Sequence, residues 1–250
     1  MIHPTAIIED GATLGAGCIV HAHAHVTRHC VLGEAVVVHP FAVIGGDPQD
    51  LGFDTSTPSQ VTVGARTVLR EYVTINRATK PGGATAVGSD CFLMAASHVA
   101  HDCTLGNRVI LANAVLLAGH VAVDDRAFLG GAAVIHQFCR IGEGAMLSGA
   151  SRITRDVAPF IMAAERDEVA GLNVVGLKRR GLVPARLAEL KRAYRAVFAP
   201  TGNLRSLAAA ALASGDYASA EALLFLRFFE GGRRGFIRPH RTTEADASDA

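Results

Sequence analysis

The sequence predicts a mainly β fold, in which short parallel strands wind into a triangular coil that is followed by a small α-helical domain. Three observations lead to this fold class. Aliphatic residues recur every six positions over most of the chain, small residues recur four positions after them, and the period stops after Pro159, before helical patterns begin at about Pro184. A unit of six residues is too short for a strand and a helix, so each unit is predicted to be one short strand and a corner.

The aliphatic period defines the coil from the first residues of the chain. It runs unbroken at first, restarts in a new register after residue 60, and is longest from residue 87 to residue 153. Three units close one coil, whose apolar positions face a shared core. The positions are Ile2, Ile8, Leu14, Val20, Val26, Leu32, Val38 and Ile44, then Val63, Leu69 and Ile75, then Val87, Leu93, Val99, Leu105, Leu111, Leu117, Val123, Leu129, Ile135, Ile141, Leu147 and Ile153.

Small or β-branched residues fill the slot four positions after most of these aliphatic residues. All five cysteines occupy that slot, and no two of them form a CxxC pair. Their number is odd, which argues against a disulfide framework. We therefore predict that they are small buried hydrophobes. The five are Cys18, Cys30, Cys91, Cys103 and Cys139.

Glycine often follows the aliphatic residue directly, as in Leu32-Gly33 and Val63-Gly64. These glycines are predicted to form the sharp corners of the coil, because a positive φ is least costly for glycine.

Two segments interrupt the period and are predicted to be loops, near residues 46–60 and 77–86. The coil domain with these loops is expected to span residues 1–183, the helical domain 184–238, and a polar tail 239–250. In the helical domain, Leu187, Leu190, Tyr194 and Val197 fall on one face of a first helix. Further helices are predicted over 204–213 and 218–229.

Composition restricts the classes of partner. The net charge of +1 gives no field that would favour nucleic acid or an anionic membrane. No apolar run approaches the roughly 20 residues of a membrane span, and the N-terminus lacks the regions of a signal peptide. We expect a cytoplasmic protein without a nucleic-acid partner and without stable membrane insertion.

The coil of three units converts sequence spacing into columns of polar residues. Residues three units apart lie on adjacent coils, about 4.8 Å apart along the axis. His101, Gly119 and Gln137 form one column, and Asp102 and His120 form the next. The spacing therefore brings an imidazole, a glycine amide and further polar groups into one patch, with His98 and His136 near the same edges.

Several segments resemble the hexapeptide-repeat acyltransferases, and among them the UDP-N-acetylglucosamine O-acyltransferases of lipid A synthesis. The resemblance extends over roughly residues 2–238. It implies a left-handed parallel β-helix, although the general rule for parallel crossovers would favour the right-handed form. The segments are Ser97-His98-Val99-Ala100-His101-Asp102-Cys103, Leu117-Ala118-Gly119-His120, Ile135-His136-Gln137-Phe138, Pro48-Gln49-Asp50-Leu51 and Gly176-Leu177-Lys178-Arg179-Arg180-Gly181.

The resemblance implies transfer of a 3-hydroxyacyl group from acyl carrier protein to the glucosamine 3-hydroxyl, the first step of lipid A biosynthesis. A sugar hydroxyl is a poor nucleophile, so His101 is expected to be the general base. Asp102 would orient the imidazole, and the Gly119 amide would stabilise the oxyanion. Adjacent side chains on a strand point to opposite faces, so a corner is needed to bring His101 and Asp102 together.

The same resemblance implies the binding residues and the partners. No bound cofactor or metal is expected, because phosphopantetheine on acyl carrier protein carries the acyl group. A basic face with Arg186, Lys191, Arg192 and Arg195 would dock the acidic carrier protein, and the chain is expected to form a homotrimer with sites between subunits. The implied contacts are Asp50, His98, His120 and Gln137 with the sugar, His136 with the acyl donor and the sugar, Asn173, Arg179 and Arg180 with nucleotide and phosphopantetheine, and Gly149 with the end of a long acyl chain.

Three departures from the family pattern keep the acceptor open. Gly52 stands where relatives usually carry lysine, Asn76 where a His-Arg-Gly-Thr segment is usual, and Val175 where an acidic residue is usual. Acylation of the nitrogen of the 3-amino sugar analogue is therefore a second hypothesis, and the acyl length is not determined. We also consider a γ-class carbonic anhydrase, in which His98, His101 and His120 of neighbouring subunits would hold zinc, and a catalytically silent solenoid.

Overall fold

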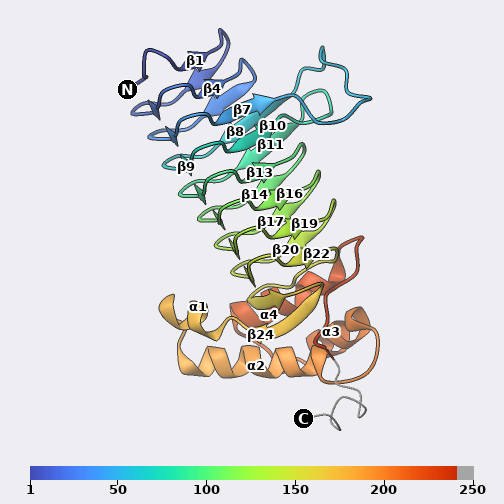
Figure 1. Cartoon of the computed structure of the whole chain (residues 1–250). Helices are drawn as coiled ribbons and strands as arrows, with labels where there is room; N and C mark the ends of the chain where they lie inside the picture. The colour runs from blue at the N-terminus through green and yellow to red at the C-terminus, as the bar shows by residue number, and fades with distance from the viewer. Residues whose placement is uncertain (241–250) are drawn as a thin grey trace, which may run out of the picture.

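The computed structural model describes residues 1–240. The strands form three sheets that run along the sides of a prism, and the helices close its C-terminal end (Figure 1). The prism is a left-handed parallel β-helix, so the predicted fold class is confirmed.

Each side of the prism is one sheet, here called sheets I, II and III. Sheet I contains β1 (Ile7–Ile8), β4 (His25–Val26), β7 (Val43–Gly46), β10 (Thr74–Asn76), β13 (His98–Val99), β16 (Leu116–Leu117), β19 (Val134–Ile135) and β22 (Arg152–Ile153). Sheet II contains β2 (Thr13–Leu14), β5 (Cys30–Leu32), β8 (Gln60–Val63), β11 (Ala84–Val87), β14 (Thr104–Leu105), β17 (Ala122–Val123) and β20 (Arg140–Ile141). Sheet III contains β3 (Ile19–Val20), β6 (Val37–Val38), β9 (Val68–Leu69), β12 (Phe92–Leu93), β15 (Ile110–Leu111), β18 (Phe128–Leu129), β21 (Met146–Leu147), β23 (Ile161–Ala164) and β24 (Glu168–Leu172).

Residues three units apart in the sequence pair with each other on neighbouring coils of these sheets. Leu111 pairs with Leu129 on the next coil in parallel, and both side chains are fully buried. Most strands contain two residues, the first facing outward and the second facing the core. The five cysteines are free and buried in this core, so their predicted role as small core residues is confirmed.

The predicted reason for the glycines that follow the aliphatic residues holds for Gly45, whose φ is 85°, but is wrong for the others, such as Gly33 and Gly64. Gly33 does not have a positive φ; a Cβ on it would lie 2.7 Å from the backbone nitrogen of Ala65 on the next coil. The left-handed corner is two residues later, at Ala35, whose φ is 54°. These glycines therefore allow close approach of successive coils, and residues with side chains adopt the corner conformation.

Two loops leave the prism and lie beside each other, at the upper right of Figure 1. The first spans residues 47–59, between β7 and β8. The second spans residues 77–83 and is shorter than predicted, because Ala84 to Val87 pair with Gln60 to Val63 as strand. The amide of Gly82 donates a hydrogen bond to the carbonyl of Pro58 at 2.7 Å, which joins the two loops.

The C-terminal part begins with three elements that the sequence did not predict. Strands β23 and β24 form an antiparallel pair, and α1 (Val174–Arg179) follows them. The three predicted helices are present as α2 (Pro184–Phe198), α3 (Leu204–Ala213) and α4 (Ala220–Arg227), the last continued by the 3-10 helix η1 (Phe228–Glu230). Helix α2 buries Leu187, Leu190 and Val197, as its pattern predicts. Residues 241–250 of the predicted tail lie outside the described residues.

No helix within residues 1–240 is both long enough and apolar enough to cross a membrane.

Candidate active site

His101 and Asp102 form a hydrogen-bonded pair at the corner between sheets I and II. The corner joins β13 to β14, and Asp102 adopts a left-handed conformation with φ of 59°. This turn brings the two adjacent side chains together, with Nδ1 of His101 2.8 Å from Oδ2 of Asp102. Both side chains keep partial access to solvent, at 17% and 15%. The corner thus provides an imidazole whose second nitrogen is available for proton transfer.

Gly119 lies directly against this imidazole on the next coil. A Cβ at position 119 would be 2.5 Å from Cε1 of His101 and 2.7 Å from Nε2, so only glycine fits there. Within residues 1–240 its N–H donates to no protein acceptor. The sequence spacing predicted that Gly119 lies next to His101 on the following coil, and the structure places it there.

His120 and Phe138 extend the corner over the following coils. The ring of His120 meets that of His101 edge to face, with centroids 5.1 Å apart, and its Nε2 is 3.8 Å from Oδ2 of Asp102. Phe138 stacks on His120 at 4.6 Å. Burial lowers the pKa of His120, while Asp102 acts in the opposite direction. Phe138 was given no role in the sequence analysis. Its spacing of three units from His120 would nevertheless have predicted that the two rings lie on adjacent coils.

His98 lies on the sheet I side of the corner. Its Nδ1 is 2.7 Å from Oγ1 of Thr74, the residue that pairs with it on the preceding coil. Burial lowers the pKa of His98, and the neighbouring His101 adds to the effect. His136 and Gln137 lie on the exposed rim, where Nδ1 of His136 is 3.2 Å from the carbonyl of Gln137.

Thr79 is a polar neighbour of Asp102 that sequence reasoning missed. Its hydroxyl donates a hydrogen bond to Oδ2 of Asp102 at 2.7 Å. Thr79 belongs to the loop 77–83, which lies outside the period, so no spacing rule connects it with Asp102.

Asp50 and Gly149 lie away from this corner. Asp50 is exposed on the loop 47–59, where its Oδ1 accepts from the amide of Gly52 at 2.9 Å. Gly149 lies at the corner between sheets III and I, after β21 and before β22. Neither contacts His101, so a single chain does not bring these residues to that imidazole.

Asn173 and Arg180 lie at the third corner, between sheets II and III. The side chain of Asn173 caps α1 by accepting from the amide of Gly176 at 3.0 Å, and it donates to the carbonyl of Gly144 at 3.2 Å. Arg180 donates to the carbonyl of Arg126 at 2.9 Å and lies 3.8 Å from Glu143.

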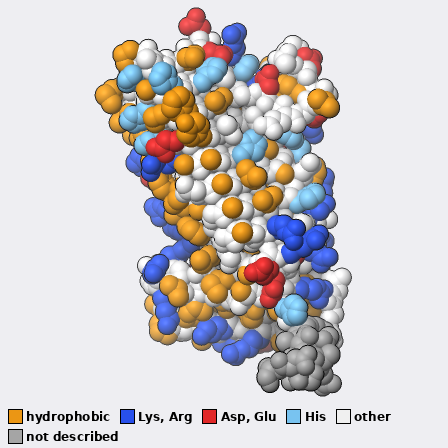
Figure 2. All heavy atoms as spheres, in the orientation of Figure 1, with side chains coloured by type: hydrophobic (Ala, Val, Ile, Leu, Met, Phe, Trp, Pro, Cys, Tyr) orange, Lys and Arg blue, Asp and Glu red, His pale blue; other side chains and the backbone are white. Residues whose placement is uncertain are grey.

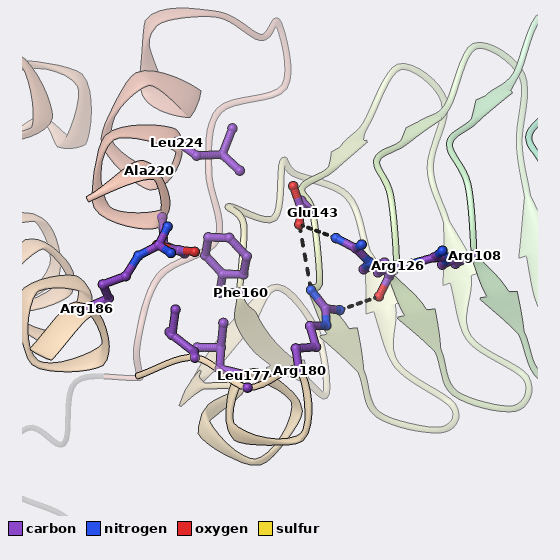
Figure 3. A pocket seen from close by; sticks show the side chains of 12 residues that line it. Arg108, Arg126, Glu143, Phe160, Leu177, Arg180, Arg186, Ala220 and Leu224 are labelled. Carbon is purple, nitrogen blue, oxygen red and sulfur yellow. Dashed lines mark hydrogen bonds and ion pairs between the residues drawn. The ribbon is translucent and has the colours of Figure 1, made fainter. Parts of the chain in front are cut away.

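Arg180 lines a cleft of about 420 Å³ between the last coils and the helices (Figure 3). Arg108 and Arg126 also line the cleft, and Phe160 and Leu177 make part of its wall apolar. Arg179 is exposed nearby at the end of α1. The cleft therefore combines cationic side chains with an apolar wall.

The carbonic anhydrase hypothesis requires histidines of neighbouring subunits around one zinc ion. Within residues 1–240 of a single chain, the group whose ligand atoms lie within 4.8 Å of one another is His101, Asp102 and His120, without His98. Two of its atoms, Nδ1 of His101 and Oδ2 of Asp102, are already bonded to each other. This arrangement suits a base and its orienting acid.

Known proteins resemble this chain over nearly its whole length. A family model described as UDP N-acetylglucosamine O-acyltransferase, domain 2, matches residues 156–237. An acyl-(acyl-carrier-protein)–UDP-N-acetylglucosamine O-acyltransferase of Agrobacterium fabrum is 41% identical over 262 residues, with 96% of each chain covered. The enzyme of the same name from Rhizobium etli is 42% identical over 246 residues, covering 89% of this chain and 88% of the relative.

Solved structures give the same result for the fold. The UDP-N-acetylglucosamine acyltransferase from Campylobacter jejuni matches with a TM-score of 0.85 at 35% identity, covering 96% of this chain and 100% of that chain. The enzyme from Bacteroides fragilis matches with a TM-score of 0.88 at 32% identity, covering 95% of this chain and 100% of that chain.

Proposed function

This chain belongs to the UDP-N-acetylglucosamine O-acyltransferase family, and we propose that it transfers a 3-hydroxyacyl group from acyl carrier protein to the 3-hydroxyl of UDP-N-acetylglucosamine, the first step of lipid A biosynthesis. The observation that supports it best is the position of the His101 imidazole, between the carboxylate of Asp102 and the open face of Gly119.

His101 is the general base of this reaction. The bond from Nδ1 to Asp102 keeps the proton on Nδ1, so Nε2 carries the free lone pair. Nε2 takes the proton of the sugar hydroxyl while the oxygen attacks the thioester carbonyl. When the tetrahedral intermediate collapses, the C–S bond breaks and the imidazolium returns the proton to the phosphopantetheine thiolate. A base in this role contributes about 10² to 10⁴ in rate.

Gly119 provides the oxyanion donor. Its N–H has no other acceptor within the described residues, and without a side chain the glycine lets the carbonyl oxygen approach. A backbone donor directed at the developing charge contributes about 10² to 10³ in rate.

The sugar would contact His98, His120, His136 and Gln137 near the base. It would also contact Asp50, which lies away from the base on the loop 47–59. Burial lowers the pKa of His98 and of His120, which favours their neutral, hydrogen-bonding forms. Asn173, Arg179 and Arg180 would hold the nucleotide and phosphopantetheine, because arginine binds phosphate with a planar pair of N–H groups. Gly149 would leave room for the end of the acyl chain.

A homotrimer is proposed because the three groups of site residues lie at three corners of the prism. Neighbouring subunits that pack side by side would bring the His101 corner of one chain close to residues of the next. Three outward residues of sheet I are apolar and exposed, namely Ile7 at 55%, Leu116 at 43% and Val134 at 43%. Figure 2 shows regularly spaced hydrophobic side chains on one face of the prism. A second chain would cover this surface.

Acyl carrier protein is the proposed donor partner, and its acidic surface would dock on the helical end. Lys191, Arg192 and Arg195 lie on α2, and Figure 2 shows Lys and Arg side chains around this end of the molecule. Arg186 contributes less, because it is paired with Glu221 at 2.7 Å.

A direct assay tests the reaction. Purified protein is incubated with radiolabelled UDP-N-acetylglucosamine, or with its 3-amino analogue, and with 3-hydroxyacyl carrier proteins of several chain lengths. We expect acylated UDP-N-acetylglucosamine, and His101→Ala should lose turnover by about 10² to 10⁴ while its circular dichroism and oligomeric mass stay unchanged. Product from the 3-amino analogue alone would assign the chain to N-acylation, and no product from either acceptor would refute the proposal.

A further inference from the structure

The loop 77–83 contacts the acid of the catalytic pair through one residue. The hydroxyl of Thr79 donates to Oδ2 of Asp102 at 2.7 Å, and its backbone N–H lies 3.2 Å from each carboxylate oxygen. The same Oδ2 accepts from Nδ1 of His101 at 2.8 Å. The Thr79 hydroxyl and the His101 imidazole therefore bind the same carboxylate oxygen. The hydroxyl thereby fixes the rotation of the Asp102 carboxylate relative to His101.

The segment that carries Thr79 is itself held firmly. Arg77 is fully buried, donates from Nε to Asp47 at 2.7 Å and from Nη2 to the carbonyl of Thr55 at 2.7 Å, and also bonds to the carbonyl of Thr57. On the other side, the backbone amide of Asp102 donates to Oγ1 of Thr85 at 2.8 Å. Thr79 therefore joins two anchored segments, which is what a positioning contact requires.

The electrostatics of Asp102 agree with this contact. Burial would raise the pKa of Asp102, but the hydrogen bonds from Thr79 and His101 outweigh burial, and the net direction is downward. Of the groups that lower it, the Thr79 hydroxyl acts most strongly. The surrounding titratable or charged groups are His120, His98, Lys80 and Arg233.

We propose that Thr79 is a positioning residue for the general base, because its hydroxyl orients Asp102 so that Nδ1 of His101 stays protonated and Nε2 faces the acceptor. This inference rests on the proposed acyl transfer. Thr79 acts through Asp102 and does not itself touch the reacting atoms.

The test compares Thr79→Val with Thr79→Ser. Valine should lower kcat by about ten- to hundredfold, the range for loss of one hydrogen bond to a charged group, with little change in KM for the sugar nucleotide. Without the hydroxyl, the carboxylate is no longer held against Nδ1 of His101 and stabilises a protonated imidazole less, so the acidic limb of the kcat/KM profile should move to lower pH. Serine keeps the hydroxyl and should restore most of the activity and the original profile.

A double-mutant cycle with Asp102→Asn separates positioning from a structural role. Valine at position 79 should cause no further loss in the Asp102→Asn background, because its effect passes through that carboxylate. The matched control is Thr104→Val, an exposed threonine on sheet II, which should behave as wild type. The inference is overturned by an unaltered pH profile in Thr79→Val, by equal losses for valine and serine, or by an additive cycle. Failure of the wild-type protein to turn over would instead overturn the acyl transfer and this inference together.

Discussion

At the scale of single residues, the His101 ring determines which residue can stand at position 119. The imidazole fills the space that any side chain at position 119 would need, with Cε1 2.5 Å from the position of a Cβ. The glycine is therefore required for the packing of the imidazole, and in the proposed mechanism it also lets its own N–H approach the oxyanion. Asp102 depends on a second local feature, the left-handed corner, which turns its carboxylate toward the ring of His101.

Gly119→Ala should displace the imidazole and lower kcat by at least about 10², since both the base and the oxyanion donor move. Steady-state kinetics with a thermal melt measure the effect. The control is Gly131→Ala, at the equivalent position of another corner, where a Cβ would meet its nearest atom at 3.4 Å. Normal turnover in Gly119→Ala would mean that the amide has no catalytic role.

The cysteine thiols should be unreactive in the folded protein. Burial raises the pKa of Cys30 to about 11 and the pKa of Cys103 and Cys139 to about 12, so the reactive thiolate is scarce at pH 8. Titration with Ellman's reagent should detect almost no thiol in native protein and five per chain in guanidinium chloride. Rapid modification of a thiol under native conditions would contradict burial of all five.

At the scale of elements, the coils are regular but the two loops depend on one arginine. Arg77 is 1% exposed, and its guanidinium bonds to Asp47 and to two carbonyls of the loop 47–59 while lying 4.7 Å from the ring centroid of Phe53. The loop that carries Asp50 is thereby attached to the coil that precedes His101.

Arg77→Met should loosen this loop, because the carbonyls of Thr55 and Thr57 and the carboxylate of Asp47 lose their donor. It should lower the free energy of unfolding by roughly 1 to 3 kcal/mol. We expect faster chymotrypsin cleavage after Phe53 and a higher KM for the sugar nucleotide. Arg28→Met is the control, because this arginine forms an ion pair on the surface with 65% of its side chain exposed. Unchanged proteolysis would show that the loop is held by other contacts.

At the scale of the whole molecule, a single chain divides the proposed site among its three corners. His101, Gly149 and Arg180 lie at different corners, and the outward faces between them include exposed apolar side chains. An assembly that covers those faces would complete the site between subunits.

Leu116→Glu places a charge on the apolar face of sheet I and should prevent trimer formation. Size exclusion with light scattering should give the mass of one 26.1 kDa chain, whereas wild type should give three. Thr104→Glu, at an exposed threonine of sheet II, is the control and should remain trimeric. A trimer that survives Leu116→Glu would exclude this face as the interface.

Much of the fold could be predicted because each coil repeats one physical requirement. Every strand must place one aliphatic side chain in a narrow core, so the period, the register and the proximity of His101 to Gly119 follow from spacing. The helices α2 and α3 follow from amphipathic pattern. The pair β23 and β24 and helix α1 did not, because they leave the period and are too short for a helical pattern to reveal them.

Spacing alone establishes which residues share a column, since a coil of three units brings them onto one line whatever the details of the corners. The folded chain was needed to show that Thr79 bonds to Asp102, that Arg77 attaches the first loop, and that the glycines serve close packing of the coils. The physical reason is that the repeat constrains the residues it contains, whereas loops outside it are placed by hydrogen bonds between segments without a regular spacing.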